Sequence, residues 1–120
     1  MGRVLIVDDE EEAVDVLSDF FTDLGFQART ALNGEEALTL LGDEQYDLIM
    51  LDLRMPQVDG ESVIKELHAR GLDTQVIVMT GISDGGVTKE KLEQYKVKGY
   101  IEKPIDLNIL EDIIKGVRPT

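Results

Sequence analysis

Short runs of apolar residues, rich in Val and Ile, alternate along this chain with segments whose apolar residues recur every three or four positions. Residues 4–7, 48–51 and 76–79 are such runs. Short β-branched runs are typical of buried strands, and the longer spacing is typical of amphipathic helices. The alternation repeats five times, which predicts right-handed crossovers and a parallel sheet with helices on both faces.

In the first half of the chain, apolar residues at helical spacing over 13–24 predict a helix that the following glycine ends. Residues 27–31 predict a weaker second strand. Asn33 followed by Glu36 resembles a capping box and predicts a second helix, which Gly42 would stop.

In the second half, a third strand is expected over 47–52, followed by a helix with Asp59 as its cap. The fourth and fifth strands are expected over 75–80 and 99–102, and Asp106 would cap the final helix. Between these strands, residues 81–98 have a sparse apolar face and two consecutive glycines. Each glycine costs a helix about 1 kcal/mol relative to Ala, so we expect this segment to be the most mobile.

At 120 residues the chain is long enough for one domain with a sizeable core, and we expect that domain to span residues 1–120. No cysteine is present, which excludes disulfides and thiolate metal sites and fits a reducing compartment. His68 is the only histidine, so a zinc site would lack its usual ligands.

The formal net charge of −13 limits the kinds of molecule that this chain can bind. Such a charge repels phosphate backbones and anionic lipid surfaces, which argues against direct binding of nucleic acid or of a membrane. The first apolar run, residues 4–7, is too short for a signal-peptide core or a membrane span. These observations predict a cytoplasmic protein.

Four of the predicted strands end in polar or charged residues. Asp8 and Asp9 follow the first strand, Asp52 ends the third, Thr80 ends the fourth, and Lys103 follows the fifth. The carboxyl ends of parallel strands meet at one edge of a sheet, where ligands of such folds bind. We therefore expect these side chains to lie close together.

Three carboxylates at one edge repel one another. At an effective dielectric near 20, two unit charges about 5 Å apart interact by roughly 3 kcal/mol, and one lysine does not neutralise three acids. Oxygen ligands without Cys or His suit a hard cation such as Mg²⁺ or Mn²⁺. A carboxylate beside such an ion can attack phosphorus, with a hydroxyl and an ammonium as donors to the phosphoryl oxygens.

Each of these residues also has an ordinary structural explanation. Acids in the first turn of a helix are favoured by its dipole, Asp52 suits a turn, and Thr80 suits a strand. Lys103 alone would be a solvated surface residue. Their joint placement at four strand ends is what indicates a site.

Five motifs carry a resemblance to a known family. They are Val-Asp-Asp-Glu at 7–10, Leu-Asp-Leu-Arg-Met-Pro at 51–56, Asp-Gly at 59–60, Met-Thr-Gly at 79–81 and Lys-Pro at 103–104. Together, in this order and spacing, they resemble the receiver domain of two-component response regulators over essentially the whole chain. The resemblance implies a flavodoxin-like, doubly wound (βα)5 fold with strand order 2-1-3-4-5.

The resemblance also implies a role for each site residue. Asp52 would contact Mg²⁺ (or Mn²⁺) and accept a phosphoryl group from a partner's phosphohistidine. Asp9 would bind the metal directly and Asp8 largely through water. The other implied features are a metal contact from the main-chain carbonyl of Arg54, phosphoryl contacts from Thr80 and Lys103, a switch formed by Thr80 and Tyr100, and a cis peptide bond between Lys103 and Pro104.

The implied phosphodonor is a sensor histidine kinase or a histidine phosphotransfer protein. The implied output is a downstream protein or domain that binds the face formed by the fourth helix, the fifth strand and the fifth helix, and phosphorylation-dependent homodimerisation is left open. The domain would catalyse its own phosphotransfer and dephosphorylation without acting as an enzyme on an outside substrate.

Three alternatives stay open on the sequence alone. A metal-dependent phosphatase with an aspartyl-phosphate intermediate usually carries a second acid two residues after the nucleophile, where this chain has Arg54. A flavodoxin-like cofactor binder needs hydrogen-bond donors after the first strand, where residues 8–12 are all acidic. The third alternative is a receiver that serves only as a docking surface.

The chain departs from the family pattern at Gln57, a position where glycine is common in the family.

Overall fold

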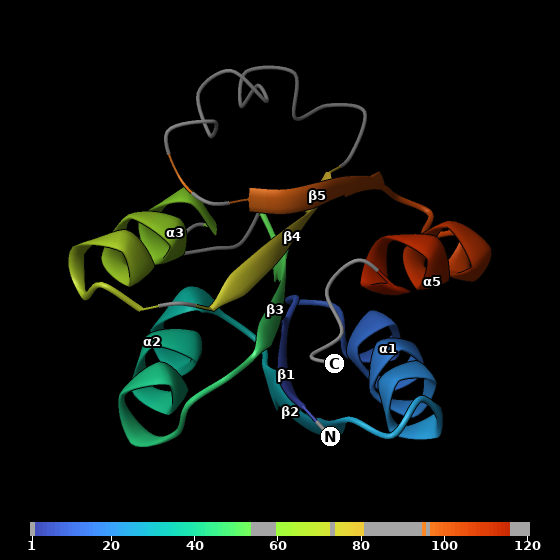
Figure 1. Ribbon diagram of the computed structural model, residues 1–120, viewed down its shortest axis with the longest axis horizontal. Coiled ribbons are helices and arrows are strands. Elements are labelled where there is room, and N and C mark those ends of the chain that lie inside the picture. The colour runs from blue at the N-terminus through green and yellow to red at the C-terminus, as the bar shows by residue number, and fades with distance from the viewer. Residues whose placement is uncertain (1, 54–59, 73, 81–94, 96, 116–120) are drawn as a thin grey trace.

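The computed structural model describes residues 2–53, 60–72, 74–80, 95 and 97–115. A five-stranded sheet runs through the middle of the molecule, with helices on both sides (Figure 1). Its strands are β1 (Arg3–Val7), β2 (Gln27–Ala31), β3 (Leu48–Asp52), β4 (Gln75–Thr80) and β5 (Val97–Glu102).

Neighbouring strands all pair in parallel, in the order β2-β1-β3-β4-β5. The predicted fold class and strand order are therefore confirmed. Val7 of β1 lies opposite both Ala31 of β2 and Leu51 of β3, so these three strands finish nearly level. β5 begins at Val97, two residues before its predicted start.

Within the described residues, four helices pack on the sheet: α1 (Glu11–Asp23), α2 (Gly34–Asp43), α3 (Gly60–Ala69) and α5 (Leu107–Lys115). α1 and α5 cover one face, and α2 and α3 cover the other (Figure 1). The helix expected between β4 and β5, and the mobility expected there, fall almost entirely outside the described residues. None of the described helices is long and apolar enough to cross a membrane.

The strands supply two core layers because their side chains alternate between the faces of the sheet. Leu5 and Ile49 pack with residues of α2 and α3 on one face. Ile6 and Met50 pack with Phe21 and other residues of α1 and α5 on the opposite face. All five residues of β3 are buried, as expected for a central strand of a parallel sheet.

Side chains cap two helices at the predicted positions. Asn33 Oδ1 accepts a hydrogen bond from the backbone N of Glu36 at 2.8 Å, and Asp106 Oδ1 accepts one from the backbone N of Asn108 at 2.8 Å. Glu36 Oε2 accepts from the backbone N of Leu32 at 3.1 Å and not from that of Asn33, so the capping box is displaced by one residue. Asp59, the predicted cap of α3, lies outside the described residues.

Two of the glycines predicted to end helices behave differently. Gly25 has a φ of 95° and follows α1, in agreement with the prediction. Gly42 lies inside the last turn of α2, which continues to Asp43. The predicted stop is one residue too early because a glycine without positive φ can remain in a helix.

Candidate functional site

The carboxyl edge of the sheet gathers the polar residues that end its strands. Asp8 directly follows β1, Asp52 is the last residue of β3, and Thr80 is the last residue of β4. Lys103 directly follows β5, and its backbone N donates to the carbonyl oxygen of Thr80 at 2.8 Å. This bond holds the start of the β5–α5 connection beside the end of β4.

Two carboxylates are buried at this edge. Asp8 is 0% exposed and Asp52 is 4% exposed, and they are the only charged residues of the described part of the chain that are buried to this degree. Removing a carboxylate from water costs several kcal/mol unless a cation and hydrogen bonds compensate. The fold must therefore supply positive charge at this point.

A single ammonium group bridges the two buried carboxylates. Lys103 Nζ donates to Asp8 Oδ2 at 2.7 Å and to Asp52 Oδ2 at 3.1 Å. Burial acts to lower the pKa of Lys103, but hydrogen bonds to Asp8 and Asp52 and the charges of these acids outweigh it, so the pKa is raised. Lys103 thus stays protonated at neutral pH and links the ends of β1, β3 and β5. The next peptide bond, Lys103–Pro104, is cis, the isomer that the resemblance implies.

The second oxygen of Asp8 holds the beginning of α1. Asp8 Oδ1 accepts a hydrogen bond from the backbone N of Glu10 at 3.0 Å. The backbone N of Asp8 donates to the carbonyl oxygen of Ala31 at 3.1 Å, which continues the β1–β2 pairing past the strand. Both carboxylate oxygens and the backbone of Asp8 are therefore held in place.

Gly60 allows α3 to begin against the end of β3. Its backbone N donates to the carbonyl oxygen of Leu53 at 3.4 Å. A Cβ atom at this position would lie 2.5 Å from the carbonyl oxygen of Asp52 and 2.8 Å from Leu53 Cα. A side chain here would collide with the backbone that carries Asp52. Arg54 and Gln57, which the sequence also singles out, lie outside the described residues.

The residues present fit a site for a hard cation. Asp8, Asp9 and Glu10 each offer a carboxylate oxygen, and these oxygens lie within 4.8 Å of one another. Asp9 and Glu10 are exposed and Asp8 is buried. Carboxylate oxygens of this kind suit Mg²⁺ or Mn²⁺, which keep several waters and accept phosphate oxygens. The sequence assigned no metal role to Glu10, although Glu10 ends the Val-Asp-Asp-Glu motif, because it belongs to an acidic run that also suits the first turn of a helix.

The structure does not bring all the predicted site residues into direct contact. Asp8, Asp52 and Lys103 are joined by hydrogen bonds, and Thr80 is tied to Lys103 through its main chain. Tyr100 lies opposite Val78 in the sheet and packs, half-buried, against the core layer on the α2–α3 side.

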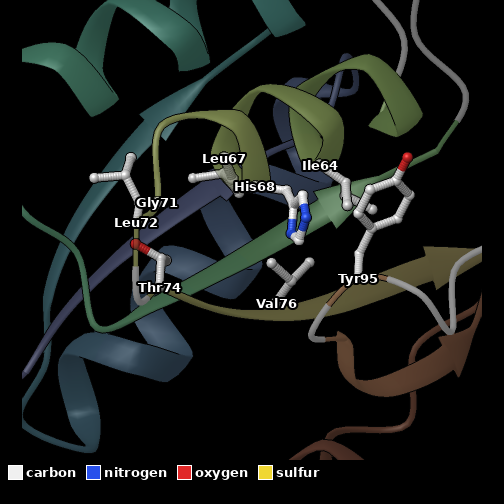
Figure 2. A pocket seen from close by; sticks show the side chains of 8 residues that line it. All are labelled: Ile64, Leu67, His68, Gly71, Leu72, Thr74, Val76 and Tyr95. Carbon is white, nitrogen blue, oxygen red and sulfur yellow. The ribbon is translucent and has the colours of Figure 1, made fainter.

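At least two cavities open on the described surface. One, of about 570 Å³, lies beside the acidic edge and is lined by Glu10, Val16, Lys103, Pro104 and neighbouring residues of α1 and α5. Figure 2 shows the other, of about 180 Å³, between α3 and the beginnings of β4 and β5. In it the rings of His68 and Tyr95 meet edge to face, with centroids 5.4 Å apart. This second cavity contains none of the acids and lies towards the opposite edge of the sheet.

Comparison with known proteins agrees with this geometry. Residues 4–115 match the family model of the response regulator receiver domain. Regulatory protein AtoC from Escherichia coli (strain K12) is 36% identical over 115 residues, which cover 96% of this chain and 25% of AtoC. Sporulation initiation phosphotransferase F from Bacillus subtilis (strain 168) is 30% identical over 117 residues, which cover 98% of this chain and 94% of that protein.

A solved structure extends the likeness to three dimensions. The response regulator protein TrrA from Thermotoga maritima, in complex with Mg²⁺-BeF, has a TM-score of 0.85 and 30% identity, over 98% of this chain and 100% of TrrA. This chain spans about a quarter of the length of AtoC but nearly all of the other two relatives. The chain belongs to the response regulator receiver domain family, the receivers of two-component systems.

Proposed function

We propose that Asp52 is the phosphoacceptor of this receiver. The observation that carries the proposal is the pair of buried carboxylates, Asp8 and Asp52, held by one ammonium at the carboxyl edge of the sheet. A lone buried carboxylate would be explained by its ion pair. Among the described residues, these two carboxylates and the exposed Glu10 beside them outnumber the one ammonium group that contacts them, which favours a bound cation.

A magnesium ion, with manganese as an alternative, is the cofactor we propose. Asp8, Asp9, Asp52 and the main-chain carbonyl of Arg54 would hold it, and it would supply positive charge to the phosphoryl oxygens. The chemistry of the oxygen donors around Asp8 supports this assignment. The complex of TrrA with Mg²⁺-BeF supports it as well.

In the proposed reaction, Asp52 is the nucleophile and Lys103 is a hydrogen-bond donor. A carboxylate oxygen of Asp52 forms a new P–O bond while the P–N bond of a phosphohistidine breaks, and the imidazole nitrogen leaves with the electron pair. Lys103, already hydrogen-bonded to Asp52, then donates to a phosphoryl oxygen. The Thr80 hydroxyl is the second donor in this proposal, because Thr80 ends the neighbouring strand.

The new charge at Asp52 would bias a two-state switch formed by Thr80 and Tyr100. Receiver domains are generally not classical enzymes, and we propose that this one catalyses only its own phosphotransfer and dephosphorylation.

The proposed phosphodonor is a sensor histidine kinase or a histidine phosphotransfer protein in the cytoplasm. The output is a downstream protein or domain that contacts β5, α5 and the segment before β5, and a phosphorylation-dependent homodimer would use the same face. We assign the receiver to residues 1–120 as a single unit.

The test is the intact mass of the protein after incubation with acetyl phosphate, with and without Mg²⁺. The wild type should gain one phosphoryl increment only with Mg²⁺, and Asp52→Asn should gain none. Asp19→Asn, which removes an exposed carboxylate of α1, is the matched control and should behave as the wild type does. An increment that survives in Asp52→Asn would move the acceptor to another residue.

A further inference from the structure

We propose that Glu10 holds the ammonium group of Lys103 when a divalent cation occupies the buried carboxylates, and so acts as a positioning residue for the phosphoryl-transfer site. The inference rests on the proposed function, because it presupposes a cation site at the acidic edge.

Lys103 stands within reach of three carboxylates. Its Nζ lies 2.7 Å from Asp8 Oδ2, 3.1 Å from Asp52 Oδ2 and 3.8 Å from Glu10 Oε1. The first two acids are buried, whereas 70% of the Glu10 side chain is exposed. A shift of roughly 1 Å would turn the contact with Glu10 into a hydrogen bond. Glu10 is thus an acceptor at the rim of the same site.

The side chain of Glu10 is not engaged by its helix. Glu10 is the N-cap residue of α1, with extended backbone angles, yet its side chain makes no capping hydrogen bond. Ser, Thr, Asp and Asn are the residues that cap helices well, and Glu is not among them. Asp8 instead fixes this position by accepting a hydrogen bond from the backbone N of Glu10 at 3.0 Å. The backbone of Glu10 is therefore held while its carboxylate faces Lys103.

The two bonds that Lys103 makes involve oxygens that a cation site needs. Asp8 Oδ2 and Asp52 Oδ2 are both occupied by the ammonium. Two positive charges a few ångströms apart repel each other, so we expect Lys103 to give up at least one of these bonds when a divalent cation binds the same oxygens. Glu10 is the remaining acidic partner that the described structure gives Lys103. It keeps the ammonium at the rim, from which Lys103 can reach a phosphoryl oxygen on Asp52.

A double-mutant cycle separates this role from a direct attraction between Glu10 and the cation. The Mg²⁺ dissociation constant is measured by calorimetry at low ionic strength for the wild type, Glu10→Gln, Lys103→Met and the double variant. Glu11→Gln, which removes the same charge from the next exposed position, is the matched control. Glu10→Gln should weaken binding roughly two- to fivefold in the wild-type background, and Glu11→Gln should weaken it less. In the Lys103→Met background, Glu10→Gln should have no larger effect than Glu11→Gln.

Each other result has a distinct meaning. An equal loss from Glu10→Gln in both backgrounds would show direct attraction to the cation and overturn the inference. Equal effects of Glu10→Gln and Glu11→Gln in the wild-type background would overturn it as well. Absence of Mg²⁺ binding by the wild type would instead refute the proposed function itself. Lys103→Gln replaces Lys103→Met if the latter does not fold, as judged by circular dichroism.

Discussion

At the scale of single residues, Gly60 shows how closely α3 packs against the end of β3, the strand that carries Asp52. A Cβ at Gly60 would meet two backbone atoms, the carbonyl oxygen of Asp52 at 2.5 Å and Leu53 Cα at 2.8 Å. Backbone atoms cannot rotate away as the end of a side chain can. Any larger residue must therefore displace the start of α3 or the end of β3.

We expect Gly60→Ala to lower the free energy of unfolding by about 1–3 kcal/mol, as overpacking does in other cores. Urea denaturation measures this change. Gly42→Ala is the matched control, because the nearest atom to its added Cβ is Arg70 Nη1 at 3.9 Å. That variant should be neutral or stabilising by up to about 1 kcal/mol, since alanine favours a helix. Equal losses in the two variants would contradict the role given to Gly60.

Some residues of the candidate site could be predicted from the sequence, and others could not. Asp8, Asp52 and Lys103 were predictable because each follows or ends an apolar run, and parallel strands bring such ends together. Glu10 was not, since an acid in a first helical turn already has an explanation in the helix dipole. The steric role of Gly60 depends on how closely α3 approaches β3, a distance that no local pattern encodes.

At the scale of elements, α2 depends on a side-chain cap. Asn33 Oδ1 accepts from the backbone N of Glu36, an N–H that has no partner inside the helix. Asn33→Ala should therefore cost about 1 kcal/mol of stability, measured by urea denaturation. Asn108→Ala, at an exposed position of α5, should change stability by less than about 0.5 kcal/mol. A loss at Asn33 no larger than that at Asn108 would show that the cap is unimportant.

Element types were predictable where periodicity was strong, and element ends were less so. β5 starts at Val97 because its pairing with β4 begins there, opposite Val76. Val97 suits a strand, but Lys98 and Gly99 separate it from the apolar residues that follow, so the boundary is defined by the neighbouring strand. In the same way, Gly42 stays helical because the last turn of α2 places no demand for positive φ on it.

At the scale of the whole molecule, charge opposes compactness. The chain carries 25 acidic and 12 basic side chains, and its net charge is −13. Salt screens repulsion between exposed charges, so the Tm should rise as NaCl increases from about 20 mM to about 500 mM. Thermal unfolding followed by circular dichroism measures this. A Tm that falls with NaCl would contradict the argument from repulsion.

MgCl₂ at equal ionic strength should raise the Tm further in the wild type than in Asp52→Asn, because the bound ion stabilises only the folded chain.

The bond between Lys103 and Asp8 joins residues 95 positions apart in the chain. On a ribosome that adds about 5–20 residues per second, Lys103 is made roughly 5–20 s after Asp8. Asp52 is made about midway through that interval, and from then until Lys103 is added the nascent chain has both acids but not the ammonium that joins them. The carboxyl edge of β1 and β3 must then stay open to water, and the unfinished chain cannot close around its own site until the fifth strand has been synthesised.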